Sequence, residues 1–406
     1  MKKVVFLIWV AAGLLLCLGG CSHSGQLTDK GGSGKDSLLQ VKAKTGNNLI
    51  EVGVTKKYPL KEIRLQDIAD VEYVPLETNR EFIADGQICF AGDKNIIISN
   101  NAGEGSILIF DRQGKAVKKI NRKGQGPEEY FSLGSVTFDS EKRELYVNNM
   151  FAKKISVYDM EGNYKRSFYH LPGEQYSSFS VFNDKELIVP CRGQKANESC
   201  LILSKSNGQR TGTVNILYKE KQSLAFTMER EDGAFGTMLT IVFPLIHKGA
   251  DMIVNEISSD TIFRFTKDYN LIPLLTRTPS VLETTPFIAL MVTLETTHYL
   301  FMQTIRKEWD KKMNTAFPRT FLMADKRTGE IGEYVLFNDD YPGVPIVFDG
   351  LANAVFSNEN QSFVPLRASR LREAFEKGGL KNELKEIAAN LKEDDNDVVM
   401  FLKFKN

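Results

Sequence analysis

The sequence predicts an all-β fold, a six-bladed β-propeller with a helical insertion before its closing strand. Three observations predict it: a hairpin unit that recurs along the chain, a four-strand pattern around the clearest copy, and a C-terminal strand placed to close a ring. The propeller is expected over residues 49–406, after a signal peptide at residues 1–20 and a flexible tether at residues 21–48.

The hairpin unit consists of an extended apolar run, an aspartate, a turn with glycine, and a second extended run. It occurs at residues 107–115 and again 48 residues later at residues 155–163. Weaker copies follow at residues 201–208, 262–270 and 321–329. Turn residues between extended runs are the signature of a two-strand hairpin. The sequence therefore predicts five hairpins.

Two further short strands precede the second hairpin, at residues 136–139 and 144–148. One repeat thus supplies four strands, and successive hairpins lie 46 to 61 residues apart. This is the spacing of propeller blades, in which each twisted sheet packs against its two neighbours. A β-sandwich would also contain hairpins, but it gives no reason for the aromatic-Asp-turn-Gly pattern to recur at one point of each unit.

The C-terminus predicts how the ring closes. Apolar residues recur at helical spacing over residues 366–391, and residues 398–404 have the composition of a strand. We expect a helix that covers an edge of the last blade, and pairing of the C-terminal strand with the strand at residues 71–76. Such pairing removes exposed sheet edges and joins the two ends of the domain.

A family resemblance rests on the stretch Gly124-Gln125-Gly126-Pro127-Glu128-Glu129-Tyr130 and on residues 136–162, which together resemble an NHL-type repeat. With residues 67–78, they make the chain similar to six-bladed β-propeller lipoproteins common in Bacteroidetes, whose function is generally unassigned. The resemblance implies a propeller over nearly all of residues 60–406. One departure is Asn148-Asn149, where NHL repeats usually place aspartate.

The N-terminus has the order of a bacterial signal peptide: two lysines, then the 15-residue apolar run of residues 4–18. A membrane-spanning helix needs about 20 apolar residues. The run closes on Leu18-Gly19-Gly20-Cys21, which resembles a lipobox and predicts lipid attachment at Cys21. Three acyl chains, at about 0.8 kcal/mol per buried CH₂, would hold the chain permanently on a membrane. The alternative is ordinary secretion, with Cys21 as an unmodified thiol.

The residues after Cys21 favour a location in the cell envelope. Surface-exported lipoproteins of Bacteroidetes usually carry acidic residues behind the cysteine, whereas Ser22-His23-Ser24-Gly25 follow it here. This favours the periplasmic face of the outer membrane over the cell surface. The tripeptide Asp36-Ser37-Leu38 resembles a Bacteroidetes O-glycosylation site, and so does Asp260-Thr261-Ile262; Ser37 is the expected acceptor because its segment is polar and glycine-rich.

Three cysteines remain in the predicted domain. Cys191 and Cys200 flank a polar stretch between two strand-like runs, so a hairpin turning near residues 195–196 would place them opposite each other. Facing Cβ atoms lie about 4.5–5.5 Å apart, close to disulfide geometry. Cys191 and Cys200 are therefore a candidate disulfide, with two unpaired core thiols as the alternative. Cys89 is expected to be a buried small hydrophobic residue.

Composition and motifs limit the chemistry. The chain carries 52 basic and 51 acidic residues, which argues against a nucleic-acid partner. The histidines His170, His247 and His298 are too far apart in sequence for a local metal motif, and no metal site is predicted. Acidic turns at residues 338–340 and 394–397 lack the calcium-loop pattern and are expected to be solvated. No cofactor is predicted, with calcium or another divalent metal in the channel as the alternative.

Two functional hypotheses remain. The first is a binding or scaffold module on the membrane, whose propeller holds a glycan, peptide or protein partner. The alternative is a propeller hydrolase, lactonase or lyase with a metal-assisted site in the central channel. A channel site collects single residues from different blades and leaves no contiguous motif, so the sequence does not decide between them.

Overall fold

The computed structural model describes residues 42–43, 49–101, 104–191, 197–229, 233, 235–310, 315–352 and 360–406. The predicted signal peptide, Cys21 and Ser37 lie outside these residues. Among the helices of the described residues, none combines the length and the apolar character needed to cross a membrane.

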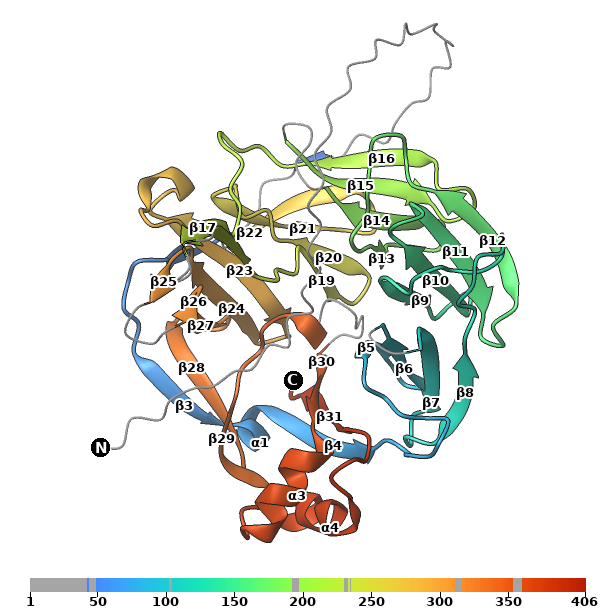
Figure 1. The fold of residues 1–406 in the computed structure, drawn as a ribbon. Helices are drawn as coiled ribbons and strands as arrows, with labels where there is room; N and C mark the ends of the chain where they lie inside the picture. The colour runs from blue at the N-terminus through green and yellow to red at the C-terminus, as the bar shows by residue number, and fades with distance from the viewer. Residues whose placement is uncertain are drawn as a thin grey trace, which may run out of the picture. The chain divides into compact units, whose positions relative to one another are not determined.

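Six sheets are arranged as blades around a common centre (Figure 1), which confirms the predicted six-bladed β-propeller. Blade 1 contains β5 (Gln87–Ala91), β6 (Asn95–Asn100), β7 (Ser106–Asp111) and β8 (Ala116–Ile120). Blade 2 contains β9 (Val136–Asp139), β10 (Glu144–Asn149), β11 (Lys154–Asp159) and β12 (Tyr164–Tyr169). Blade 3 contains β13 (Ser180–Val181), β14 (Glu186–Pro190), β15 (Glu198–Ser204) and β16 (Arg210–Asn215).

Blades 4 and 5 carry additional strands. Blade 4 contains β19 (Leu245–Lys248), β20 (Asp251–Val254), β21 (Thr261–Phe265) and β22 (Asn270–Thr278), and β1 (Lys42–Ala43) and β2 (Ile50–Gly53) pair in parallel with β22. Blade 5 contains β23 (Ile288–Glu295), β24 (Tyr299–Arg306), β27 (Arg319–Asp325), β28 (Ile331–Asn338) and β29 (Tyr341–Ile346), and β3 (Leu60–Arg64) pairs in parallel with β28. Lys42–Ala43 lies inside the stretch predicted as tether.

The five predicted hairpins are all present, as β7–β8, β11–β12, β15–β16, β21–β22 and β27–β28. Local turn chemistry explains why. Asp159 Oδ1 accepts the backbone N–H groups of Glu161 (3.0 Å) and Asn163 (2.8 Å). Gly162 has a φ of +85°, a conformation that glycine adopts without steric cost. The Asp-x-x-Gly pattern therefore specifies this turn directly, and the turn at Asp111–Gly114 has the same pattern.

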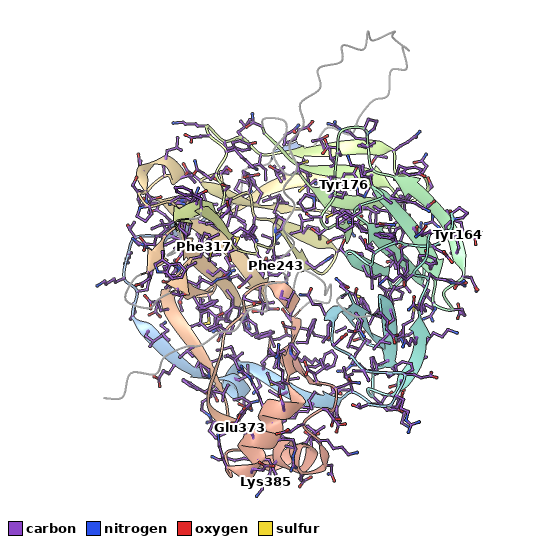
Figure 2. All side chains as sticks on the ribbon, in the orientation of Figure 1. Tyr164, Tyr176, Phe243, Phe317, Glu373 and Lys385 are labelled. Atoms are coloured by element: carbon purple, nitrogen blue, oxygen red, sulfur yellow. The ribbon has the colours of Figure 1, made fainter. Side chains whose placement is uncertain are left out.

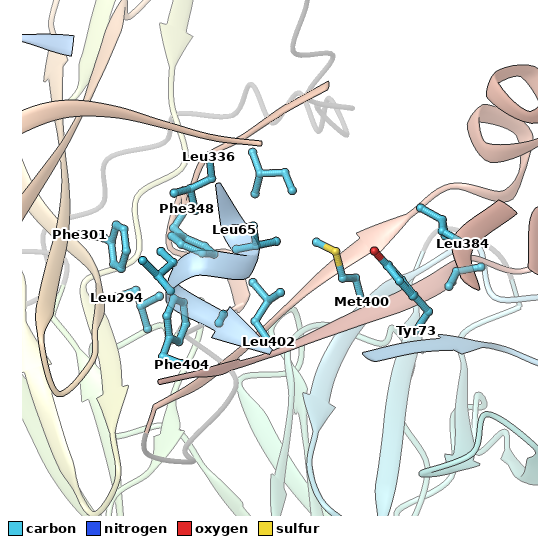
Figure 3. Packing of buried hydrophobic residues seen from close by; sticks show 14 of the residues in the cluster. Leu65, Tyr73, Leu294, Phe301, Leu336, Phe348, Leu384, Met400, Leu402 and Phe404 are labelled. Atoms are coloured by element: carbon cyan, nitrogen blue, oxygen red, sulfur yellow. The ribbon is translucent and has the colours of Figure 1, made fainter. Parts of the chain in front are cut away.

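Blade 6 closes the ring with strands from both ends of the domain, as predicted. β31 (Val398–Phe404) lies between β30 (Gln361–Leu366) and β4 (Ala69–Pro75), with Val398 opposite Pro75 and Phe404 opposite Ala69. Figure 3 shows the core that this closure builds, in which Met400 lies beside Tyr73 and Phe404 packs near Phe301.

The helical insertion is two short helices rather than the single helix expected over residues 366–391. α3 (Ala368–Glu376) and α4 (Asn382–Asn390) are separated at Gly378, which has a φ of +68°. A residue in this left-handed conformation ends a helix. Leu371 and Leu384 bury the helices against the blade 5 and blade 6 core. The remaining elements are α1 (Leu65–Ile68), the 3₁₀ helix η1 (Val281–Glu283), and the hairpins β17 (Ala225–Glu229) with β18 (Phe235–Leu239) and β25 (Trp309–Asp310) with β26 (Thr315–Ala316).

The antiparallel order within the blades gives the ring two different faces. On the turn face, the connections from first to second and from third to fourth strand contain two to five residues in blades 1 to 5. The loop face carries two kinds of connection: those from the second to the third strand of a blade, and those that lead from one blade to the next. Between blades 1 and 5, the connections from one blade to the next contain nine to 29 residues. Lys42 lies opposite Asn270, the first residue after a turn-face turn, so the chain joins the propeller at the turn face.

Candidate functional site

A cavity of about 710 Å³ lies among the blades and is the candidate functional site. Its wall includes residues of β5, β9, β13 and β19, the first strands of blades 1 to 4. The strand β9 contacts both β5 and β13. Phe243, which precedes β19 and also lines the cavity, lies toward the middle of the ring of blades (Figure 2). The cavity is therefore the central channel of the propeller.

At the loop face the channel wall is polar but uncharged. Gln87, Ser177 and Ser178 are exposed there, and their side chains have no hydrogen-bond partner among the described residues. Ser99 and Asn101, also in the wall, hydrogen-bond to each other. The aromatic rings in the wall are phenylalanines: Phe90, Phe138, Phe179, Phe182 and Phe243.

His247, on β19, is the one of the three histidines that lines the channel. Its side chain is half-buried, and within the described part of the chain it has no hydrogen-bond partner. Burial lowers the pKa of His247 to about 4 because desolvation disfavours the imidazolium. The ring is therefore neutral at pH 7 and adds no charge to the channel.

Charged groups in the wall lie at the turn-face end, and one carboxylate is already paired. Asp139 and Lys205 form an ion pair of 2.5 Å, and the side chain of each is only 2% exposed. Asp139 also accepts the backbone N–H groups of Glu141 (3.1 Å) and Lys142 (3.0 Å). This carboxylate joins blade 2 to the turn after β15. Its hydrogen bonds hold it in the structure rather than offer it to a ligand.

His170 has a packing role in blade 2. It is 6% exposed, its ring centroid lies 4.2 Å from that of Tyr176, and its Nδ1 accepts the backbone N–H of Tyr176 (3.3 Å). Nε2 therefore carries the proton and donates to Asn148 Oδ1 (3.0 Å). Asn148, at the position where NHL repeats usually have aspartate, is fully buried and donates to Tyr176 O (2.9 Å). His298 lies in the turn between β23 and β24, so the structure does not bring the three histidines together.

The strand register differs by one residue from the one that would place Cys191 opposite Cys200. Cys200 lies opposite Pro190, while Cys191 N–H donates to Ser199 O (2.9 Å). Side chains alternate between the faces of a strand, so this register directs Cys191 and Cys200 to opposite faces of the sheet. Cys200 packs in the core between blades 3 and 4, and Cys191 against the core between blades 2 and 3.

The thiols of Cys89, Cys191 and Cys200 are all free in the structure. The facing geometry that motivated the disulfide is therefore absent, and the two thiols sit as separate core groups. The turn expected near residues 195–196 lies outside the described residues. Cys89 is buried, as expected.

In each acidic turn one buried asparagine belongs to a packing network, while the side chain of Asp339 is 40% exposed and Asp394 is exposed, in keeping with the solvated turns expected. Asn338 is 1% exposed and donates to Tyr73 Oη (2.8 Å), whose hydroxyl donates to Asp340 (2.9 Å). Asp339 pairs with Arg64. Asn396, 3% exposed, donates to the carbonyl oxygens of residues 77 and 82 (2.7 and 2.9 Å) and so fixes the segment before blade 1. Within the described ranges, no group of three or more His, Cys, Asp or Glu residues is placed to hold a metal ion.

Sequence reasoning missed the residues of the channel mouth. Ser177, Ser178 and Gln87 lie just before or at the start of first strands in two different blades. The position of these residues within the repeat could have identified them from the sequence, because the start of each first strand lies at the loop-face mouth of the channel. Hydroxyl, amide and phenyl groups of this kind can hold an uncharged ligand by hydrogen bonds and by contact with ring faces.

Residues 49–403 match the family described as Domain of unknown function (DUF4934). A putative exported protein from Bacteroides fragilis is 15% identical, with a TM-score of 0.60 over 88% of this chain and 100% of that one. A member of the DUF4221 family from Bacteroides vulgatus is 12% identical, with a TM-score of 0.47 over 83% of this chain and 97% of that one.

No curated protein matches the sequence. The similarity to the Bacteroides fragilis structure supports the fold, and the expected resemblance to propeller proteins of unassigned function is confirmed. Because the family match spans nearly the whole predicted domain, residues 49–403, the chain belongs to the DUF4934 family.

Proposed function

We propose that this chain is an exported, lipid-anchored binding module whose propeller takes an uncharged ligand into the loop-face mouth of its channel. The observation that carries the proposal is the channel wall: at that mouth, unpartnered hydroxyl and amide groups such as Gln87, Ser177 and Ser178 surround a cavity of about 710 Å³. Exposed hydroxyl and amide groups at the mouth of a cavity are free to hydrogen-bond a ligand that enters it. A glycan, a peptide or a loop of a protein partner has this chemistry.

The channel wall favours binding over the alternative, a hydrolase, lactonase or lyase. The carboxylate of Asp139 is occupied by Lys205 and by two backbone N–H groups. His247 is neutral and has no carboxylate or hydroxyl partner among the described residues, whereas a general base is normally oriented by such a partner. A binding role needs neither feature.

The binding role is tested by narrowing one mouth of the channel. Ser177 is exposed at the loop-face mouth and Ser140 is exposed in the wall at the other end, so Ser177→Trp and Ser140→Trp are matched substitutions. The probes are a panel of neutral oligosaccharides and a random library of 12-residue peptides. We expect binding of at least one probe, lost in Ser177→Trp and retained in Ser140→Trp. Equal binding by both variants, or no binding from either panel, would contradict the proposal.

Anchoring through Cys21 rests on the lipobox-like Leu18-Gly19-Gly20-Cys21. Export is supported by a structural relative described as a putative exported protein. The periplasmic face of the outer membrane is the proposed location, because no acidic residues follow Cys21 directly. The test compares Cys21→Ser with Cys17→Ser, which removes the neighbouring cysteine of the signal peptide. We expect Cys21→Ser to leave the detergent phase and Cys17→Ser to stay in it. Equal partitioning of both variants would refute the anchor.

A further inference from the structure

Arg319 is a half-buried cation without an ion-pair partner among the described residues. The other half-buried arginines that the structure describes each form an ion pair with a glutamate: Arg112, Arg166, Arg210, Arg264 and Arg372. The buried Arg277 instead donates to the carbonyl oxygens of residues 279 and 288 and to Thr284 Oγ1. Arg319 donates only to two neutral side chains. Because charges taken out of water are normally paired, Arg319 departs from the pattern of the molecule.

The two neutral side chains hold the guanidinium of Arg319 in a defined orientation. Nη1 donates to Gln303 Oε1 (2.9 Å), and Nη2 donates to Thr240 Oγ1 (2.9 Å). Gln303 is 1% exposed, and its Nε2 donates to Asp349 O (2.9 Å), which directs its Oε1 toward Arg319. A guanidinium carries five N–H donors, so two are used and three remain without a partner in the described part of the chain.

The remaining donors of Arg319 are accessible. The Nε atoms of Arg210 and Arg264 are buried without a partner, whereas the Nε of Arg319 is not buried in this way. Desolvation of the half-buried guanidinium lowers the pKa of Arg319, and the charge of the Asp349 carboxylate raises it. An arginine keeps its charge at any physiological pH. Arg319 therefore presents a permanent, oriented cation whose free N–H groups a ligand can reach.

Asp349 acts on Arg319 through its charge but does not occupy the guanidinium. Its side chain is exposed, and its Oδ1 accepts the backbone N–H of Leu351 (3.0 Å). The charges of Arg319 and Asp349 sum to zero, so the pair has no excess positive charge with which to hold a dianion such as a phosphate ester. A carboxylate carries a single charge, and its two oxygens match the planar fork of a guanidinium. The chemistry therefore favours a monocarboxylate.

Arg319 lies beside the mouth of the channel and outside the residues that line it. It is the first residue of β27, at the end of a loop-face connection. Its partner Thr240 directly precedes Ile241, and Asp349 lies two residues before Leu351. Ile241 and Leu351 both line the channel, whereas Arg319 does not. The guanidinium is therefore a site of its own, next to the uncharged mouth.

We propose that Arg319 forms a second binding site on the loop face, which takes the carboxylate of a small organic acid. Its free N–H groups donate to the two carboxylate oxygens, while Gln303 and Thr240 hold the guanidinium in place. An acidic sugar and an acylated amino acid both present this group. The inference goes beyond the proposed function, because the uncharged ligand of the channel mouth does not use Arg319.

The first test measures ligand binding to the full-length chain by ligand-observed NMR. The probes are glucuronate and N-acetylalanine, each compared with its neutral amide, glucuronamide or N-acetylalaninamide. We expect one of the acids to bind at millimolar concentration and its amide to bind at least about tenfold more weakly. The acid that binds identifies the source of the carboxylate. Binding of neither acid, or equal binding of each acid and its amide, would overturn the proposal.

Variants then assign the binding to Arg319. Arg319→Gln should weaken acid binding at least about tenfold. The matched control Arg306→Gln removes the same charge from an exposed arginine at the loop-face end of the neighbouring strand and should leave binding unchanged. Equal weakening by the two variants would show an effect of overall charge and refute the site.

A second pair of variants blocks the guanidinium without removing it. Thr240→Asp places a carboxylate at the position that accepts Nη2 of Arg319 and should exclude the acid, whereas the neutral Thr240→Asn should retain it. Thr240→Asp should melt no lower than Thr240→Asn, which shows that folding is intact. Acid binding that is retained in Thr240→Asp, or lost equally in both variants, would contradict a carboxylate site at Arg319.

Discussion

Acidification is predicted to destabilise the propeller through His170. Its Nδ1 accepts a backbone N–H and its Nε2 donates to Asn148, so both ring nitrogens are used in a way that only the neutral imidazole allows. Burial lowers the pKa of His170 from 6.5 to about 4. Between these two values the unfolded chain binds more protons than the folded one, so stability falls as the pH falls.

The magnitude follows from the two pKa values. The difference between a pKa of 6.5 in the unfolded chain and about 4 in the folded chain corresponds to roughly 3 kcal/mol of the free energy of unfolding, which is lost once His170 is protonated in both states. About 2 kcal/mol of this free energy is lost between pH 7 and pH 5. The assay is urea unfolding at pH 7, 6 and 5, followed by circular dichroism, for the parent chain and for His170→Phe. The variant leaves two buried polar groups without partners and should be about 1–3 kcal/mol less stable at pH 7.

The stability difference between parent and variant is the informative quantity, because His247 and the carboxylates titrate in both proteins. We expect this difference to shrink by about 2 kcal/mol from pH 7 to pH 5. A difference that stays constant with pH would refute the assignment of a neutral, hydrogen-bonded His170.

Three further predictions concern the fold. Lys205→Met leaves the Asp139 carboxylate buried without its cation, and we expect a loss of about 3–5 kcal/mol in urea unfolding; a loss below about 1 kcal/mol would contradict the role of this pair. Deletion of residues 398–406 removes the middle strand of blade 6 and should abolish the cooperative thermal transition, whereas a parent-like melt would rule out the closure described above. Because Cys191 and Cys200 face opposite sides of their sheet, thiol counting on the unreduced, denatured domain should find both reactive, and a count short by two would contradict that register.

The features that could be predicted from sequence are those specified by local chemistry. The Asp-x-x-Gly turn at Asp159 needs only residues within five positions of one another, so the repeat exposes it directly. The closing pair of strands was predictable because residues 398–404 and 71–76 are apolar runs at opposite ends of one domain. The break between α3 and α4 was also visible in the sequence, as Gly378-Gly379, but the helical spacing on either side of it concealed two separate elements.

The features that could not be predicted depend on the register between paired strands or on which residues of different blades meet in the channel. A shift of one residue in the β14–β15 hairpin moves Cys191 from facing Cys200 to the opposite face, and composition does not fix that shift. The channel mouth brings together Gln87 and Ser177, which are 90 positions apart and have no motif in common. The hairpin β17–β18 falls between two repeats, in the connection between blades 3 and 4.

The most direct test of the account is hydrogen–deuterium exchange of the full-length chain with and without a ligand recovered from the two probe collections. The account predicts that the ligand slows exchange in loop-face segments, at residues 176–180 and 235–243, and leaves the turn-face residues 140–143 and 266–269 unchanged. Protection confined to the turn face would contradict the claim that the propeller binds through its loop-face mouth.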